Sequence, residues 1–113
     1  MTPRIVRHRW DDVPLDKVTD MVARKTLGGE DLQLTQAYFK KGTKVPVHAH
    51  DGEILLYVLQ GVIRVVTPTD DATLREGDLL VVPAGTPHQA EVLDDAFVLN
   101  MTTVMKSEVR SSK

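Results

Sequence analysis

Cysteine is absent from the sequence. Disulfide bonds, thiolate metal ligands and cysteine nucleophiles are therefore excluded, and a metal site would have to use histidine, carboxylate, amide or water ligands. A chain that uses no disulfide is expected in the cytoplasm, where thiols are kept reduced.

Long apolar runs and blocks of like charge are missing as well. The longest apolar run, residues 54–59, is far shorter than the ~20 residues that a membrane-spanning helix needs. No apolar signal-peptide segment follows the arginines of the N-terminus, so we expect no targeting segment. The 14 Lys and Arg residues nearly balance the 16 Asp and Glu residues. Without a basic patch, neither nucleic acid nor a membrane is expected as a partner.

The composition is typical of one globular domain. The chain has 113 residues, of which 42% are apolar and 27% charged, enough to bury one core. We expect a single domain over residues 1–113, with an N-terminal arm at residues 1–12. The polar end, residues 107–113, is expected to be a frayed tail.

Glycine and proline separate many short runs of β-forming residues, a pattern typical of an all-β sandwich or barrel. Gln60-Gly61 is predicted to be a hairpin turn, and Asp94-Asp95 to separate the last two strands. One short helical turn is expected within residues 14–20, capped by Asp12. The expected strands cover residues 21–27, 32–39, 44–48, 54–59, 62–67, 72–75, 79–82, 88–93 and 96–105.

The run at residues 54–59 is apolar on both faces of the predicted strand. One face can line the interior of a barrel, and the other face also needs a cover. In a small barrel a second subunit can supply it, so the sequence predicts a homodimer.

Three of the four histidines follow a pattern that suits a metal site. His48 and His50 are two residues apart on an extended segment, so both side chains project to one side. A third ligand from another strand would complete the set and leave open positions for a substrate. His88 follows a loop constrained by Pro and Gly, which fixes its backbone. An ordinary exposed or packed histidine is the alternative at each position, and it is the expectation for His8 among the N-terminal arginines.

Two motifs in this region resemble those of the cupin family. The first reads Gly42-x5-His48-x-His50, and the second reads Gly77-x5-Pro83-x-Gly85-x2-His88. The resemblance implies an antiparallel jelly-roll barrel, the cupin double-stranded β-helix, that is usually dimeric and holds one divalent transition metal. It makes His48, His50 and His88 the metal ligands. Three neutral imidazoles do not distinguish Zn, Fe, Ni, Mn, Co or Cu.

The first motif departs from the family at the position of its fourth ligand, usually Glu or Gln. Ile54 stands at that position, and Glu53 lies one residue earlier. Strand alternation directs Glu53 the other way, although the turn at Asp51-Gly52 can shift that alternation. A three-histidine site is the simplest interpretation, with Glu53 as an alternative extra ligand.

Within the family, the chain resembles the small single-domain cupins that include the pectin-degradation protein KdgF. The shared segments are Trp10-x-x-Val13-Pro14, Gly28-Gly29-Glu30 and Pro83 to His88. This resemblance implies metal-dependent enol–keto isomerisation of unsaturated uronates. The last strand differs, since it offers Asn100, Thr102 and Lys106 where the group has an Asp, an aromatic residue and an Arg. An asparagine cannot act as a carboxylate base.

Strand alternation nominates further residues of the cavity. Tyr38 and Glu91 are the titratable candidates for proton transfer, with ordinary packing or surface roles as the alternative. The expected cavity-lining residues are Gln36, Ile54, Leu56, Asn100 and Thr102.

These observations favour an enzyme that uses the metal to polarise a small oxygenated substrate. The leading hypothesis is an enol/keto isomerisation, as in KdgF, of a sugar acid or a related compound. The alternatives are a three-histidine Fe(II) dioxygenase and a non-catalytic cupin that binds a small-molecule ligand in its barrel.

Overall fold

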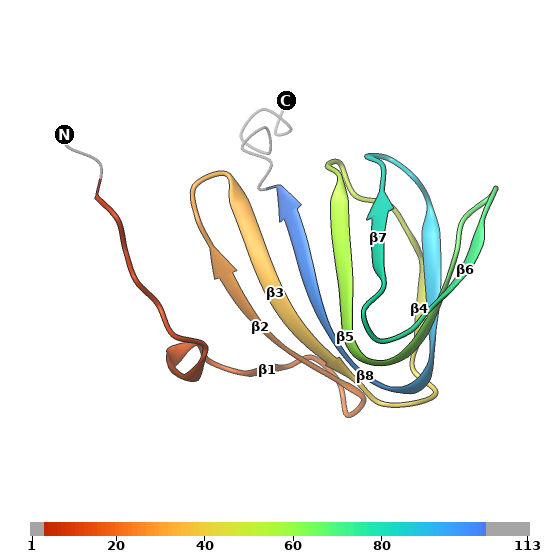
Figure 1. Cartoon of the computed structure of the whole chain (residues 1–113), viewed down its shortest axis with the longest axis horizontal. Coiled ribbons are helices and arrows are strands. Elements are labelled where there is room, and N and C mark those ends of the chain that lie inside the picture. Colours follow the sequence, from red (N-terminus) through yellow and green to blue (C-terminus); the bar gives the residue numbers. More distant parts are fainter. Residues whose placement is uncertain (1–3, 104–113) are drawn as a thin grey trace.

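The computed structural model describes residues 4–103, which form antiparallel strands and one short 3₁₀ turn, η1 (Trp10–Asp12) (Figure 1). This part of the chain contains no helix that could cross a membrane. The strands are β1 (Asp16–Lys17), β2 (Val22–Gly28), β3 (Leu32–Phe39), β4 (Lys44–His48), β5 (Ile54–Val66), β6 (Asp71–Leu74), β7 (Leu79–Val82) and β8 (His88–Thr103).

Two long strands, β5 and β8, organise the fold. They pair along their whole length, from Ile54 opposite Thr102 to Val66 opposite Gln89. At one end they are flanked by β3 and β7, and β2 and β1 extend that sheet beyond β3. At the other end β4 and β6 flank them. The two halves face each other across the interior in Figure 1, which confirms the predicted antiparallel jelly-roll barrel.

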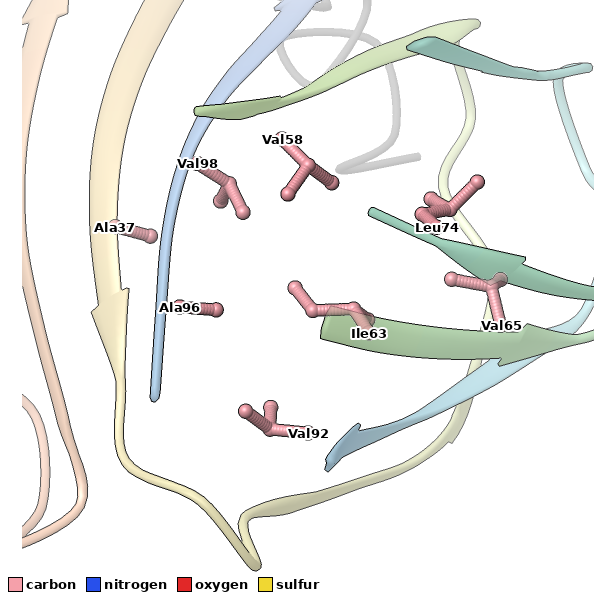
Figure 2. Close-up of a cluster of buried hydrophobic side chains, with 8 residues drawn as sticks. All are labelled: Ala37, Val58, Ile63, Val65, Leu74, Val92, Ala96 and Val98. Carbon is pink, nitrogen blue, oxygen red and sulfur yellow. The ribbon is translucent and has the colours of Figure 1, made fainter. Parts of the chain in front are cut away.

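The core fills the closed end of this barrel. Val58 and Val98 lie opposite each other on β5 and β8 and are 0% and 1% exposed. β-branched side chains pack well on a pleated surface, and burying each one stabilises the fold by about 1.5–3 kcal/mol. Figure 2 shows the full cluster: Ala37, Val58, Ile63, Val65, Leu74, Val92, Ala96 and Val98.

The hairpin predicted at Gln60-Gly61 is wrong, because β5 continues through it. The break predicted at Asp94-Asp95 is also wrong, because β8 continues there. The β5–β8 register shifts at this point, and Gly61 has a φ of 94°. A Cβ on Gly61 would overlap the carbonyl oxygen of Asp95 and lie 2.6 Å from Cα of Ala96. Glycine here is the mark of a bulge, where both strands bend together from one sheet into the other.

The helical turn predicted within residues 14–20 is wrong in position. The turn forms at Trp10–Asp12, and Asp16–Lys17 instead pair with β2. Pro14 explains why the turn ends at Asp12, because a residue before proline is driven out of the helical region, and Val13 is extended. The strand expected at residues 21–27 is confirmed as β2. Residues 104–105 of the last expected strand and the tail at 107–113 lie outside the described residues.

Replacing Gly61 with alanine should strongly destabilise the protein. The Gly61→Ala variant combines the strain of a positive φ with a backbone clash, so we expect a loss of about 3 kcal/mol or more of unfolding free energy. Gly77 is the matched control, since its φ is 91° and an added Cβ meets no atom within 4 Å. Gly77→Ala should therefore cost only about 1–2 kcal/mol in urea unfolding. Equal losses in the two variants would contradict this role for Gly61.

Candidate metal centre

His48, His50 and His88 converge at the open end of the barrel. His48 ends β4, His88 begins β8, and the two residues are direct partners in the β4–β8 pairing. The ring centroid of His48 lies 4.3 Å from that of His88 and 4.9 Å from that of His50. One ligand nitrogen from each ring lies within 4.8 Å of the other two. Three imidazoles thus surround one small space.

Backbone carbonyls set the tautomers of two of these rings. Nδ1 of His48 lies 2.9 Å from the carbonyl oxygen of Pro46, and Nδ1 of His88 lies 2.9 Å from that of Thr86. A carbonyl can only accept a hydrogen bond, so each neutral ring carries its proton on Nδ1 and donates it. Nε2 then keeps its lone pair, which is the arrangement of a histidine that binds a metal.

The loop before His88 is tied to the segment that carries His50. The amide of Gly85 donates to the carbonyl oxygen of His50 at 2.8 Å, and the amide of Thr86 donates to that of Pro83 at 3.2 Å. Gly85 has a φ of 76°, a conformation that favours glycine. The two sequence motifs are therefore held together by their backbones, independently of any metal.

The electrostatic surroundings disfavour protonation of His50. Partial burial lowers the pKa of His50, the nearby His48 and His88 lower it further, and Asp51 opposes them. Protonated imidazoles so close together would repel one another. The neutral form is the one that can offer a lone pair to a metal.

A small cavity of about 140 Å³ lies beside the three histidines. Ile54, Leu56 and Asn100, three of the predicted cavity residues, line it. Ile54, which stands where the cupin resemblance implies a fourth ligand, is 5% exposed. The Oδ1 atom of Asn100 is buried and has no hydrogen-bond partner among residues 4–103. A buried, unsatisfied acceptor is costly, so this atom is poised to accept a hydrogen bond from a ligand.

A wider groove of about 650 Å³ adjoins this cavity and shares His48, His50 and Asn100 with it. Thr102, another predicted cavity residue, lines the groove. Arg24 and Thr35 also line the groove, and they were not predicted, because the register of β2 on β3 cannot be deduced from the sequence pattern. Alternation along β2 would have found Arg24 once its pairing with β3 was known.

The structure does not bring the other candidates to the histidines. On β3, the side chain of Ala37 faces the core of the protein. The side chains of the adjacent residues Gln36 and Tyr38 therefore point to the outer face of the sheet. Tyr38 stacks there on Phe97, with ring centroids 4.5 Å apart. Glu91 lies in an outer groove with Arg64, and Glu53 is exposed and lies outside the histidine group. The inward orientation expected for Gln36, Tyr38 and Glu91 is thereby corrected.

The chain is similar to known proteins in its sequence pattern and in its fold. The model of the cupin domain matches residues 35–105. An RmlC-like cupin from Shewanella frigidimarina NCIMB 400 has a TM-score of 0.80 at 20% identity, covering 90% of this chain and 93% of that one. KdgF from Halomonas sp. has a TM-score of 0.75 at 25% identity, covering 88% and 94%. No curated protein matches the chain.

A third solved structure widens the range of chemistry on this fold. The polyketide cyclase RemF from Streptomyces resistomycificus has a TM-score of 0.75 at 21% identity, covering 88% of this chain and 80% of that one. At this identity the likeness concerns the fold alone. The family model, however, spans both histidine motifs and more than half of the residues. The chain therefore belongs to the cupin family.

Proposed function

We propose that this cupin is a metal-dependent enzyme whose three histidines hold one divalent transition metal and act on a small oxygenated substrate. The observation that carries this proposal is the pair of Nδ1–carbonyl hydrogen bonds of His48 and His88. They leave two Nε2 lone pairs beside His50, so the donor set fits Zn, Fe, Ni, Mn, Co or Cu. A cytoplasmic location is part of the same proposal.

The chain's own groups would bind and orient the substrate. The apolar wall around Ile54 and Leu56 excludes water from one side of the site. Oδ1 of Asn100 accepts a hydrogen bond from a hydroxyl or N–H of the substrate. A bound ion would supply a Lewis acid that polarises adjacent oxygens.

Enol/keto isomerisation of a sugar acid or a related compound is the first candidate reaction. The likeness to KdgF, at 25% identity over 88% of the chain, supports it. Such a reaction moves a proton, and Asn100 cannot act as its base. Solvent in the groove would then carry the proton.

Oxygen-dependent cleavage by a three-histidine Fe(II) site is the second candidate. Among residues 4–103, no Asp, Glu, Tyr or Lys lines the inner cavity. That lining favours a reaction in which the protein supplies no acid or base. A cupin that binds a ligand without turnover would use the same contacts.

We also propose that the protein is a homodimer. Leu79 and Val81 on β7 are 62% and 54% exposed, and they pair with Tyr57 and Leu55 of β5 on the outer face of the sheet. Leu55 also lies opposite Met101 of β8, so apolar side chains form adjacent rows across three strands. Soluble monomers rarely expose such a patch, and a second copy presents the same surface for self-association.

Metal binding tests the first part of the proposal. Untagged protein should bind one Zn²⁺ or Co²⁺ per chain in isothermal titration calorimetry. His88→Ala should lower the affinity by more than about 100-fold, since even loss of an outer-shell partner costs 10–100-fold. His8→Ala, which changes an exposed histidine, should leave it unchanged. Unaltered affinity in a folded His88→Ala variant would rule out the three-histidine site.

The two candidate reactions differ in their need for oxygen. The metal-loaded enzyme should change the ultraviolet absorbance of an unsaturated uronate or an enolised diketone without consuming oxygen. Anaerobic and aerobic rates should then agree. Oxygen uptake equal to substrate loss with the Fe(II) protein would instead establish the dioxygenase, and no turnover in either assay would favour the binding module.

Charge on the outer face should separate the subunits. The double variant Tyr57→Asp, Leu79→Asp should elute as a monomer in light-scattering chromatography, because the dimer would have to bury unpaired carboxylates. Thr73→Asp, on the exposed side of β6, is the control and should remain a dimer. A monomeric wild-type protein would contradict the proposed dimer.

A further inference from the structure

The inner face of the larger sheet changes from apolar to polar across neighbouring strands. One row of cross-strand partners runs from Leu80 to Leu56, then to Asn100, Thr35 and Thr26. The hydroxyls of Thr26 and Thr35 lie 3.2 Å apart, within hydrogen-bond distance. The boundary between the two halves of this row falls at Asn100, whose unsatisfied oxygen lies in the histidine cavity.

The next row shows the same change and ends in a charge. Val58 lies opposite Val98, which pairs with Ala37, and Ala37 pairs with Arg24 on β2. Arg24 and Lys44 are the charged residues that line the groove in the described part of the chain. The groove is therefore cationic, whereas the inner cavity is apolar apart from Asn100 and the histidines.

Arg24 has donors available for a ligand. Its Nε lies 3.5 Å from Oδ2 of Asp16, and the two side chains are 51% and 65% exposed. Such surface pairs contribute little and exchange readily. The guanidinium offers five donors in a planar fork that matches a carboxylate, and this pair engages one nitrogen.

The histidines stand between these two spaces. His48 and His50 border both the apolar cavity and the cationic groove, and His88 borders the cavity. β2 lies two strands away from β8, about 10 Å at about 4.8 Å per strand. An extended Arg24 side chain and a few atoms of ligand can span the distance to the half of β8 that carries Asn100, which lines both the groove and the histidine cavity.

We infer that the substrate is an oxygenated carboxylate with a short alkyl group. Its alkyl end fills the inner cavity, its adjacent oxygens lie at the histidines, and its carboxylate meets Arg24 in the groove. This inference rests on the proposed function and narrows its substrate class. A polyhydroxylated chain is disfavoured at the inner end, because Ile54 and Leu56 offer its hydroxyls no partner and burying them unpaired is costly.

Binding of 2,4-dioxoalkanoates, which carry an alkyl group, a diketone and a carboxylate in that order, tests this arrangement. Their affinity for the Zn²⁺-loaded protein, measured by calorimetry, should rise two- to fourfold with each methylene from methyl upward until the cavity is full. Ala90→Val narrows the same cavity and should shift the best alkyl length downward. Affinity that is flat or falls with length in the wild-type protein would overturn the inference, whether or not the variant folds.

The carboxylate contact has its own test. Arg24→Gln should weaken binding of the acids about tenfold and leave the corresponding methyl esters unaffected. Arg75→Gln, between β6 and β7 and outside the groove lining, is the control for a general loss of charge. Equal effects of Arg24→Gln on acids and esters would overturn the carboxylate site.

Failure of this inference can be separated from failure of the metal site. If the wild-type protein binds Zn²⁺ but shows neither length dependence nor an Arg24 effect, the substrate class is wrong and the metal centre stands. If it binds no metal, the proposed function fails. The same series with metal-free protein then still tests the alkyl and carboxylate contacts, which belong to the chain alone.

Discussion

The pairing of β4 with the first half of β8 is the constraint on which the site depends. It sets His48 directly opposite His88, and the amide of Gly85 then holds the loop before His88 to the carbonyl of His50. Backbone hydrogen bonds thus bring the three imidazoles together. A preassembled donor set binds a cation without having to order its side chains at that moment.

Further from the site, the bend at Gly61 makes this pairing available. β5 and β8 cross together from one sheet to the other. One half of β8 therefore pairs with β3, and the other half pairs with β4. The core residues Val58 and Val98 lie on the side of the bend that joins β3. The closed end of the barrel therefore supplies stability, while the open end is left to present the histidines and the groove.

The sequence predicted most of the strands and the pair His48 and His50 because those signals are local, whereas His88 was assigned through the resemblance to the cupin motifs. Two histidines two residues apart on an extended segment must share a side, whatever the strand pairs with. No local signal shows which face of β3 points inward. The inner face is the one that carries Ala37, which packs into the core, and not the one that carries Gln36 and Tyr38. Gly61 interrupts the run of β-forming residues, but both a hairpin turn and a β-bulge favour glycine at such a point. Only the close approach of Asp95 to Gly61 in the structure distinguishes the bulge from the hairpin.

The contribution of Arg24 was hidden for a related reason. It lies far along the chain from the histidines and reaches their groove only through the β2–β3 and β3–β8 registers. Cross-strand rows of this kind join five strands, from β7 to β2, into one surface that is apolar at Leu80 and charged at Arg24. Such a surface contacts both ends of a ligand, while the histidines contact its middle.

Nitrogen NMR of the histidine rings tests the central claim most directly. In ¹⁵N-labelled protein without metal, at a mildly alkaline pH, long-range proton–nitrogen spectra should show the proton of His48 and of His88 on Nδ1 and a lone pair on Nε2. Added Zn²⁺ should shift the Nε2 resonances of both and perturb one ring nitrogen of His50, and leave His8 unchanged. Nε2-protonated rings, or spectra that Zn²⁺ does not alter, would contradict a metal centre built from these three imidazoles.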